Sequence, residues 1–519
     1  MNGDDEVIQL SNELARAGAN APARPDRCWI NHWRWLAIVA GILASSGTAP
    51  ARENPNLWSV EAVFRHVPPL LHEHAGRLPM ITWPSFCQGT NDAAFERGEP
   101  LPPEVYRELE RRGLTQRLRL STNYVSMAVA MQAAGAKVVF VEGWALNGPY
   151  ELGPDPLHKL PAGFKPAAAD RHYACPTLTE GWAKKADEIR ATLRAYKSAG
   201  VKVSGVWLDW EIEPLDWSPG RWEQARACAR CQSLLPRGTL DSAQNYSAFI
   251  QDFRAALFSA YVAAPALEVY PGIPVTDWGA VVSTPDIPTL SYWGNRRLSP
   301  RDLGLFTAAN PVAYGNTIYY EFHWTTNWGY PLDVPHMDRL YTHVMLSQVS
   351  LNAANMKRSV PWKFCIPWVC RYCPDLEDEK VPILSRERYR EILRHIWLRG
   401  ADSMQIFNEP RPKHPEIYLE ELEDAVAVYD EVLAYRLFLE HGVLMNTTIP
   451  KVTDNGAIWS GLRLENEALI RGFTQNAKPV SFTITPWSDG PAVELTAPPR
   501  GQTWRLVRDG GKIKTVKMP

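Results

Sequence analysis

The chain has 519 residues, a length that allows three domains of ordinary size or one α/β barrel with an appended domain. Its composition, 45% hydrophobic and 22% charged, excludes a disordered chain, a collagen-like repeat and a multispan membrane protein. The formal net charge of −2 gives no electrostatic reason to expect a nucleic acid as partner. The 21 Trp and 43 Pro are typical of sugar-binding proteins with long ordered loops, although a large core also holds many tryptophans.

The first 51 residues resemble an N-terminal extension that ends in a secretory signal peptide. Arg34 precedes an apolar run from Leu36 to Ala44, and the segment closes with Ala49-Pro50-Ala51, an A-x-A cleavage pattern. About ten apolar residues are too few to span a bilayer. We therefore expect an exported protein, periplasmic or extracellular, with no stable membrane insertion after the signal is removed. The alternative is a short buried helix in a cytosolic protein.

Residues 52–441 alternate between apolar strand-like runs and amphipathic helical runs. The predicted strands are Leu78–Trp83, Lys137–Glu142, Lys202–Trp210, Ala266–Tyr270, Thr289–Trp293, Thr317–Phe322, Trp362–Val369 and Ser403–Asn408. The predicted helical regions are Pro103–Ala133, Trp182–Ser198, Ser242–Val262, Asp338–Met356 and Ser385–Arg399. Eight strands that alternate with helices predict an α/β fold of the (β/α)8 TIM-barrel type. No glycine-rich dinucleotide or P-loop motif follows a strand, and no cofactor is predicted.

The pattern changes after a helix predicted at about Pro415–Glu440. From residue 442 to residue 519, short alternating runs are separated by turn signals such as Asp454-Asn455-Gly456. This pattern predicts a small C-terminal β-sandwich. A barrel followed by a β-sandwich is common among carbohydrate-active enzymes. This is a likeness of fold, and function is argued from the residues of the site.

Two C-x-x-C pairs occur, Cys228/Cys231 and Cys370/Cys373. Four thiolates suit a structural zinc ion, but these pairs lie about 140 residues apart, far beyond the spacing of a compact zinc ribbon. In an exported protein the cysteines could instead form disulfides. Disulfide or mixed pairing, a zinc site and free thiols all stay open. A zinc-dependent hydrolase is the least favoured alternative, because four-thiolate sites are closed and structural.

The strongest candidate chemistry lies at the end of the strand Lys202–Trp210. Side chains two apart on a strand share a face, so Trp207, Asp209 and Glu211 point the same way. Barrel enzymes place their active groups at the carboxyl ends of strands. Two adjacent carboxyl groups repel, which leaves a protonated acid beside an ionised partner, as glycosidic cleavage requires. We predict Glu211 as the acid and Asp209 as the residue that orients the substrate; the alternative is a pair of structural carboxylates.

Further residues at predicted strand ends are candidates for substrate binding. Tryptophan and tyrosine rings stack on sugar rings, while carboxylates, amides and histidine bond the hydroxyl groups. The candidates are Trp207, Glu142, Trp144, Tyr270, Trp293, Glu321, His323, Trp324, Asn408 and Glu409. They predict a carbohydrate substrate and no nucleic-acid partner.

The segment Ser204–Glu211 resembles the D-G-x-D-x-D-W-E strand of chitinase-like glycoside hydrolases and is similar to the I-D-W-E-x-W-R-P strand of hyaluronidases. The resemblance implies that Glu211 is the general acid. It also implies that Asp209 supports an N-acetyl group of the substrate, which itself attacks the sugar carbon. The resemblance thus implies an N-acetylhexosamine-type substrate, although Ser204 and Trp207 replace the earlier aspartates of the chitinase strand.

A second partial resemblance is Asn408-Glu409-Pro410, which looks like the Asn-Glu-Pro of the large clan of retaining glycosidases. That clan carries the motif on its fourth strand, whereas here it ends the last predicted strand. Glu409 is therefore expected to be a substrate contact or a second carboxylate.

Two alternative functions stay open at this point. One is a non-catalytic polysaccharide-binding protein on a barrel fold. The other is an exo-sialidase-like enzyme in which Arg221, Arg296 or Arg297 would hold a substrate carboxylate.

Overall fold

The computed structural model describes part of the chain in detail. The described residues are 60–74, 80–82, 97–143, 177, 180–209, 219–278, 365–369, 371, 384–406, 415–450 and 454–518, with nine further positions between 338 and 353.

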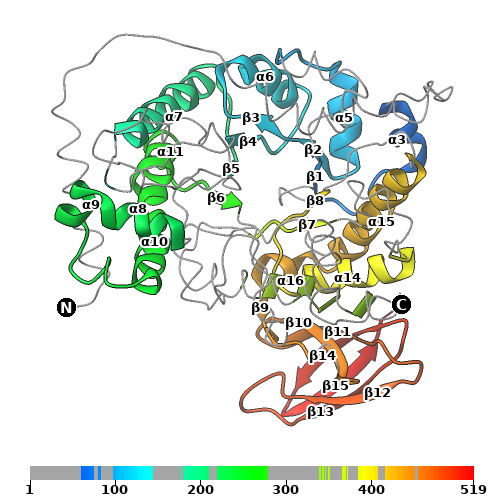
Figure 1. Cartoon of the computed structure of the whole chain (residues 1–519). Coiled ribbons are helices and arrows are strands. Elements are labelled where there is room, and N and C mark those ends of the chain that lie inside the picture. Colours follow the sequence, from blue (N-terminus) through cyan, green and yellow to red (C-terminus); the bar gives the residue numbers. More distant parts are fainter. Residues whose placement is uncertain are drawn as a thin grey trace, which may run out of the picture.

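Short parallel strands form the centre of the α/β part (Figure 1). They are β1 (Met80–Thr82), β2 (Leu114–Gln116), β3 (Leu118–Arg119), β4 (Phe140–Gly143), β5 (Gly205–Asp209), β6 (Val275–Trp278), β7 (Trp368–Val369) and β8 (Gln405–Ile406). One sheet has the order β2-β1-β8-β7 and the other β3-β4-β5-β6, and every pairing within them is parallel. Arg117 alone separates β2 from β3. Neighbouring strands therefore follow chain order, and the last strand, β8, pairs with the first, β1.

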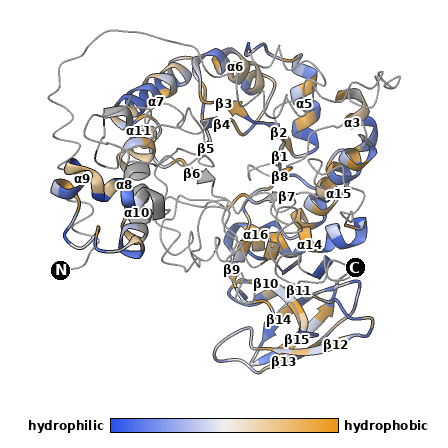
Figure 2. Cartoon of the chain, viewed as in Figure 1, coloured by the Kyte–Doolittle hydropathy of each residue, from blue (hydrophilic) through white to orange (hydrophobic). Residues whose placement is uncertain are grey.

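Helices surround these strands in Figure 1. They are α3 (Val60–His66), α5 (Pro103–Arg111), η2 (Thr122–Tyr124), α6 (Val125–Ala133), α7 (Glu180–Ser198), α8 (Pro219–Ala227), α9 (Ala229–Leu234), α10 (Ala243–Phe258), η3 (Ser259–Ala263), α11 (Ala264–Val269), α14 (Arg386–Leu398), α15 (Pro415–Leu433) and α16 (Arg436–His441). The described positions between 338 and 353 are helical as well. Figure 2 shows hydrophobic colour on β3 and β4 and hydrophilic residues on helices around them, as expected for strands covered by amphipathic helices.

Local sequence signals explain where α14 begins and ends. The Ser385 hydroxyl accepts a hydrogen bond from the Arg388 backbone N–H at 3.2 Å, which satisfies one of the free amides of the first turn. Glu387 places a negative charge at the same end of the helix. Gly400, with φ of +93°, follows the C-cap Arg399 and adopts the left-handed conformation that ends the helix.

Two predictions about secondary structure are wrong. The segment Ala266–Tyr270, predicted as a strand, forms the end of helix α11 and its C-cap Tyr270, and the strand lies later, at β6. Ala266 and Val269 are both buried and lie three residues apart, which is a helical spacing that so short an apolar run does not distinguish from a strand. The second error concerns Pro103–Ala133, which contains β2 and β3 between α5 and α6. The segment Leu114–Leu118 contains buried polar residues, so it lacks the apolar run by which the other strands were predicted.

The C-terminal part is an antiparallel β-domain, consistent with the predicted β-sandwich. Its strands are β9 (Val443–Leu444), β10 (Ala457–Arg463), β11 (Glu467–Thr474), β12 (Val480–Ile484), β13 (Val493–Ala497), β14 (Gln502–Asp509) and β15 (Lys512–Lys517). Five of them pair in the order β15-β14-β11-β10-β9, and β12 pairs with β13. Ile470, Ile484, Leu495, Trp504 and Leu506 belong to a separate buried cluster that draws side chains from both sheets.

Helix α14 joins the two parts through buried polar side chains. Glu391 and His395 of α14 and its C-cap Arg399 are spaced four residues apart and are at most 3% exposed. Arg471 of β11 donates two hydrogen bonds to the Glu391 carboxylate, at 2.9 and 2.5 Å. The Ser460 hydroxyl of β10 lies 2.7 Å from His395 Nδ1 and accepts a hydrogen bond from Arg399 Nε at 2.7 Å. We call these contacts between α14 and the β-domain the interdomain polar network.

We expect the stability of the protein to fall in acid because of this network. Burial acts to raise the pKa of Glu391, but hydrogen bonds from His395 and Arg471 and their charges hold it at about 2, below its ordinary 4.5. Burial lowers the pKa of His395 from 6.5 to about 4. Both groups bind protons more readily when unfolded, so their stabilisation is complete above pH 6.5 and is lost as the pH falls towards 2.

Urea unfolding midpoints measured between pH 7 and pH 3 would check this expectation. His395→Gln should remove the part of the pH dependence that lies between pH 6.5 and pH 4. A urea midpoint that stays constant across this range in the wild type would contradict the assignment.

Candidate active site

The candidate site lies at the carboxyl ends of the parallel strands. Asp209 is the last residue of β5 and pairs in register with Trp278 of β6. Glu142 is one residue before the end of β4 and pairs with Trp207 of β5 and Arg119 of β3. The predicted strand ends at Glu142 and Asp209 are thus neighbours, as parallel pairing brings their carboxyl ends to one edge.

The two faces of these strands differ in character. On one face, register pairs bring together Leu118, Val141 and Val206, which are all buried. On the other face, Arg119, Glu142 and Trp207 form a row across three strands. We call this second face the polar face. Packing an apolar face on helices costs no desolvation free energy. Burying a polar group does, so a polar group on a buried strand is expected to be paired or to bind a ligand.

Glu142 is anchored by an ion pair. It is 2% exposed and contacts Nε of Arg117, which is 1% exposed and lies between β2 and β3. A carboxylate buried this far is tolerated because a guanidinium compensates its charge. Glu142, predicted as a substrate contact, therefore has a fixed position on the polar face.

Trp207 lies beneath the site rather than at its surface. Its side chain is fully buried, and its ring packs edge-on against Phe140, with the centroids 5.8 Å apart and the planes at 81°. Edge-to-face packing holds both rings in place. Trp207 thus forms an apolar floor between β4 and β5, and it presents no open platform for a sugar ring in this structure.

Tyr270 does not lie at a strand's carboxyl end, because the strand predicted there is helix α11. It follows α11, and its hydroxyl donates a hydrogen bond to the Val201 carbonyl at 2.8 Å. Val201 precedes β5, so the contact lies toward the opposite, amino end of that strand. The structure thus separates Tyr270 from Asp209 and Glu142.

Both cysteines of the first C-x-x-C pair are buried. Cys228 caps helix α9, and its sulfur accepts a hydrogen bond from the Cys231 backbone N–H at 3.3 Å. Cys370 and Cys373 lie outside the described residues. Among the residues that the structure describes, no three or more histidine, cysteine or acidic side chains gather as a metal site would require.

Several other predicted site residues also lie outside the described part of the chain. They are Glu211, Trp144, Trp293, Glu321, His323, Trp324, Asn408 and Glu409. In contrast, the structure adds two residues that the sequence did not single out, Arg117 and Gln405. Arg117 was missed because its segment was assigned to a helix. Gln405 stands between the buried Met404 and Ile406, and this alternation was the available signal.

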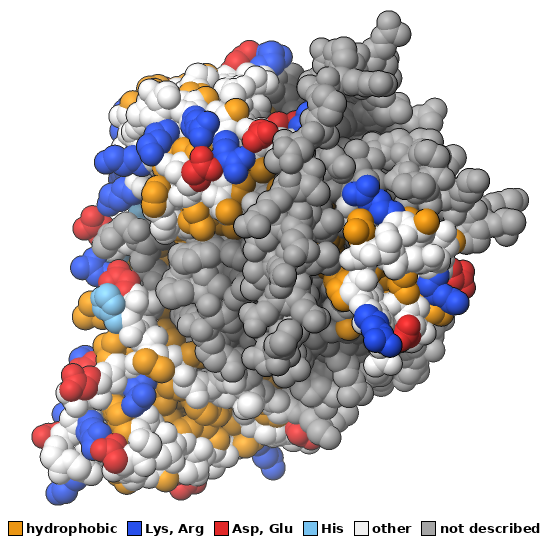
Figure 3. Space-filling view, turned by 90° about the vertical axis from the view of Figure 1, so that its left-hand side faces the viewer, with side chains coloured by type: hydrophobic (Ala, Val, Ile, Leu, Met, Phe, Trp, Pro, Cys, Tyr) orange, Lys and Arg blue, Asp and Glu red, His pale blue; other side chains and the backbone are white. Residues whose placement is uncertain are grey.

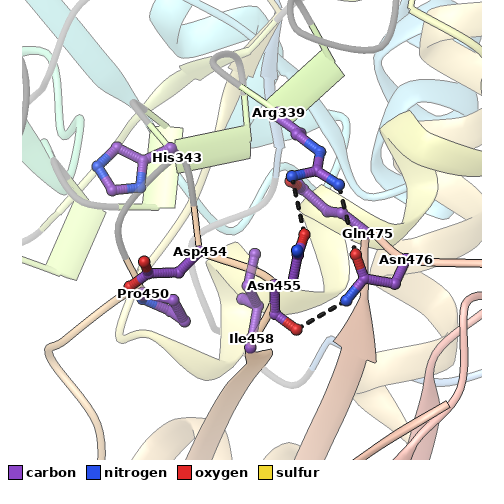
Figure 4. A pocket seen from close by; sticks show the side chains of 9 residues that line it. Arg339, His343, Pro450, Asp454, Asn455, Ile458, Gln475 and Asn476 are labelled. Atoms are coloured by element: carbon purple, nitrogen blue, oxygen red, sulfur yellow. Dashed lines mark hydrogen bonds between the residues drawn. The ribbon is translucent and has the colours of Figure 1, made fainter. Parts of the chain in front are cut away.

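A small polar cavity lies between the helical positions near residue 340 and the β-domain (Figure 4). Arg339 donates hydrogen bonds to the side-chain oxygens of Asn455 and Asn476, at 3.2 and 3.4 Å. Asn476 donates in turn to the Asn455 carbonyl at 2.7 Å. The cavity measures about 10 Å³, room for one water molecule rather than a sugar ring, so we assign it to the interdomain contact.

Acidic and basic side chains are interspersed on the surface shown in Figure 3. Glu268 of α11 pairs with Arg190 and Arg194 of α7, at 2.6 and 2.9 Å. This mixture agrees with the near-neutral net charge. None of the helices in the described residues is both long enough and apolar enough to cross a bilayer.

No protein-family model matches the chain, and no curated protein matches its sequence. Solved structures that resemble it include a GH30 endoxylanase from Clostridium papyrosolvens, with 9% identity, 87% of this chain and 96% of that chain covered, and a TM-score of 0.36. A GH36 α-galactosidase from Geobacillus stearothermophilus has 10% identity, covers 89% and 58%, and has a TM-score of 0.41. A cyclic α-maltosyl-(1→6)-maltose hydrolase from Arthrobacter globiformis has 11% identity, covers 76% and 78%, and has a TM-score of 0.34. All three are glycoside hydrolases, but similarity at this level carries no argument about the activity of this chain.

Proposed function

We propose that this chain is an exported glycoside hydrolase with its active site at the carboxyl ends of the parallel strands. The observation that carries the proposal is the position of Asp209. It ends β5, which lies between β4 and β6, and its strand neighbour β4 carries the anchored carboxylate Glu142 next to that same edge. This is where barrel enzymes gather their reacting groups.

We further infer that the parallel strands close into a (β/α)8 barrel. Counting β2 and β3 as one interrupted strand, seven strands follow one another in chain order, and β8 pairs with β1. The remaining step, from β6 to β7, corresponds to residues 279–367. The predicted strand Thr317–Phe322 in this interval would supply the eighth strand. An eight-stranded barrel has an interior that side chains fill, which suits the buried polar face.

The proposed chemistry assigns different protonation states to two neighbouring carboxyl groups. If the alternation of β5 continues, Glu211 joins Asp209 on the face of Trp207. Two carboxyl groups this close on one face repel, which favours one protonated and one ionised group. Glu211 would then protonate the leaving oxygen, while ionised Asp209 would stabilise positive charge at the sugar carbon.

The substrate that we propose is a glycan, with an N-acetylhexosamine-type sugar as its first candidate. The motif Asp209-Trp210-Glu211 supports this choice, because Asp209 stands where a chitinase-like enzyme holds the acetamido group. The remaining predicted contacts, Trp144, Trp293, Glu321, His323, Trp324, Asn408 and Glu409, belong to the same proposal.

Release of reducing sugar from a panel of substrates tests the function. The panel should contain chitooligosaccharides, hyaluronan, xylan, α-galactosides, maltooligosaccharides and sialosides. We expect release from at least one of them. No release from any of them would overturn the hydrolase, and binding of the same glycans without release would favour the polysaccharide-binding alternative.

Export is a separate part of the proposal, and it rests on the signal-like segment before Arg52. N-terminal sequencing of the protein recovered outside the cytoplasm of an expressing cell would check it. We expect the recovered chain to begin at Arg52, directly after Ala51. A protein that stays in the cytoplasm with its first 51 residues attached would contradict export.

A further inference from the structure

Gln405 on β8 is an unusual residue in the interior of this protein. Its side chain is fully buried. Among the residues that the structure describes, it is the one whose two polar side-chain atoms, Oε1 and Nε2, are both buried without a hydrogen-bond partner. Each buried polar group left without a partner costs about 1–3 kcal/mol, and native interiors contain few of them. The amide therefore destabilises the folded protein.

Backbone register places Gln405 on the polar face. Gln405 pairs with Trp368 of β7 and Ile81 of β1, and Ile81 pairs with Thr115 of β2. Alternate residues of a strand share a face, so Thr115 lies on the same face of the β2–β3 segment as Arg119. Arg119 is the register partner of Glu142. Gln405 therefore lies on the same face of the parallel strands as Arg119, Glu142 and Trp207, and its own row meets β2 four residues before Arg119.

Gln405 also lies near the edge where we place the active site. It is one residue before the end of β8, as Glu142 is one residue before the end of β4. Its chain neighbours Met404 and Ile406 are apolar, fully buried and on the opposite face. An apolar side chain would fill the position of Gln405 at less cost, so the amide requires a reason other than stability.

We propose that Gln405 is a substrate-binding residue whose amide bonds the hydroxyl groups of the bound sugar. A glutamine side chain offers two N–H donors and an oxygen that accepts two hydrogen bonds. Adjacent sugar hydroxyls each donate and accept, so they satisfy both ends of the amide. The stability that the free protein loses at Gln405 is regained in the complex, where both atoms have partners. The nature of the ligand rests on the proposed function, whereas the unpaired amide is a property of the structure.

The test compares Gln405→Met with Asn446→Leu. Methionine matches the length of glutamine and forms no strong hydrogen bond. Asn446 is the matched control because its amide is also buried but both of its polar atoms have partners: Nδ2 donates to the Trp459 carbonyl at 2.7 Å, and Oδ1 accepts from Thr448 N and Oγ1, both at 2.9 Å. It belongs to the interdomain region, away from the strand ends.

We expect Gln405→Met to keep or raise the wild-type Tm while kcat/KM falls about 10- to 100-fold, mainly through KM. Asn446→Leu should lower Tm and leave kcat/KM at the wild-type value, because it breaks hydrogen bonds far from the substrate. A fall in Tm for Gln405→Met as large as that for Asn446→Leu would overturn the proposal, since the amide would then be paired in the free protein. Unchanged kcat/KM would overturn it as well.

If the wild type releases no sugar from any substrate, the proposed function fails. The role of Gln405 is then tested by the binding of oligosaccharides to the protein. Tm is then measured with and without millimolar chitooligosaccharide, xylooligosaccharide and maltooligosaccharide. A rise in Tm with one of these sugars in the wild type, and its loss in Gln405→Met, would support the role of the amide. The absence of such a rise in the wild type would overturn it.

Discussion

Glu211→Gln is expected to lower kcat on the active substrate by about 10²- to 10⁴-fold, the contribution of a positioned general acid. Glutamine has nearly the shape of glutamic acid but cannot deliver a proton to the leaving oxygen. Substrate binding should change little, so the loss should fall on kcat rather than on KM. Steady-state kinetics and a thermal melt of the same preparation would measure both the loss and the integrity of the fold.

Glu213→Gln is the matched control for this experiment. It makes the same chemical change two residues further along the chain, where Pro214 follows and cannot donate to a strand ladder. We expect kcat within a few-fold of the wild type. Full activity of Glu211→Gln would remove Glu211 from the mechanism, and equal losses in both variants would point to a general effect of charge at this loop.

Arg471→Met is expected to lower the free energy of unfolding by about 3–5 kcal/mol, the usual cost of removing one partner of a buried ion pair. The substitution leaves the Glu391 carboxylate, which is 3% exposed, without the two hydrogen bonds that Arg471 donates to it. The site admits little rearrangement, because Gly501 packs against Glu391 so closely that a β-carbon there would collide with its carboxylate. The midpoint of urea unfolding, followed by tryptophan fluorescence, would measure the loss.

Arg505→Gln provides the comparison within the same β-domain. Arg505 also makes two hydrogen bonds to one carboxylate, that of Glu467, at 3.0 and 2.6 Å, but its side chain is 44% exposed. Water screens this pair, and we expect a loss below about 1 kcal/mol. The double variant Glu391→Gln with Arg471→Met should recover part of the stability lost by Arg471→Met, since no buried charge then remains unpaired. Equal losses for Arg471→Met and Arg505→Gln would show that the interdomain polar network contributes no more than a surface pair.

Part of the fold follows from local patterns in the chain. The apolar runs Leu78–Trp83 and Lys202–Trp210 contain β1 and β5, Lys137–Glu142 overlaps β4, and alternating residues after 442 form the antiparallel β-domain. Prediction failed where local patterns are ambiguous or masked by polar residues. Ala266–Tyr270 is too short to separate a strand from a helix, and polar residues inside β2 conceal a strand that is buried along its whole length.

The sequence by itself determined the alternation of strands and helices, the change to an antiparallel domain and the place of Asp209 at the end of a strand. Each is set by neighbouring residues, because hydrophobic period and turn chemistry act over a few positions. Only the tertiary structure decided that Arg117 neutralises Glu142, that Arg471 meets Glu391 from 80 residues away, and that Gln405 is buried on the polar face without a partner. These facts depend on strand register and on packing between distant elements, which bring together residues whose pairing no local pattern encodes.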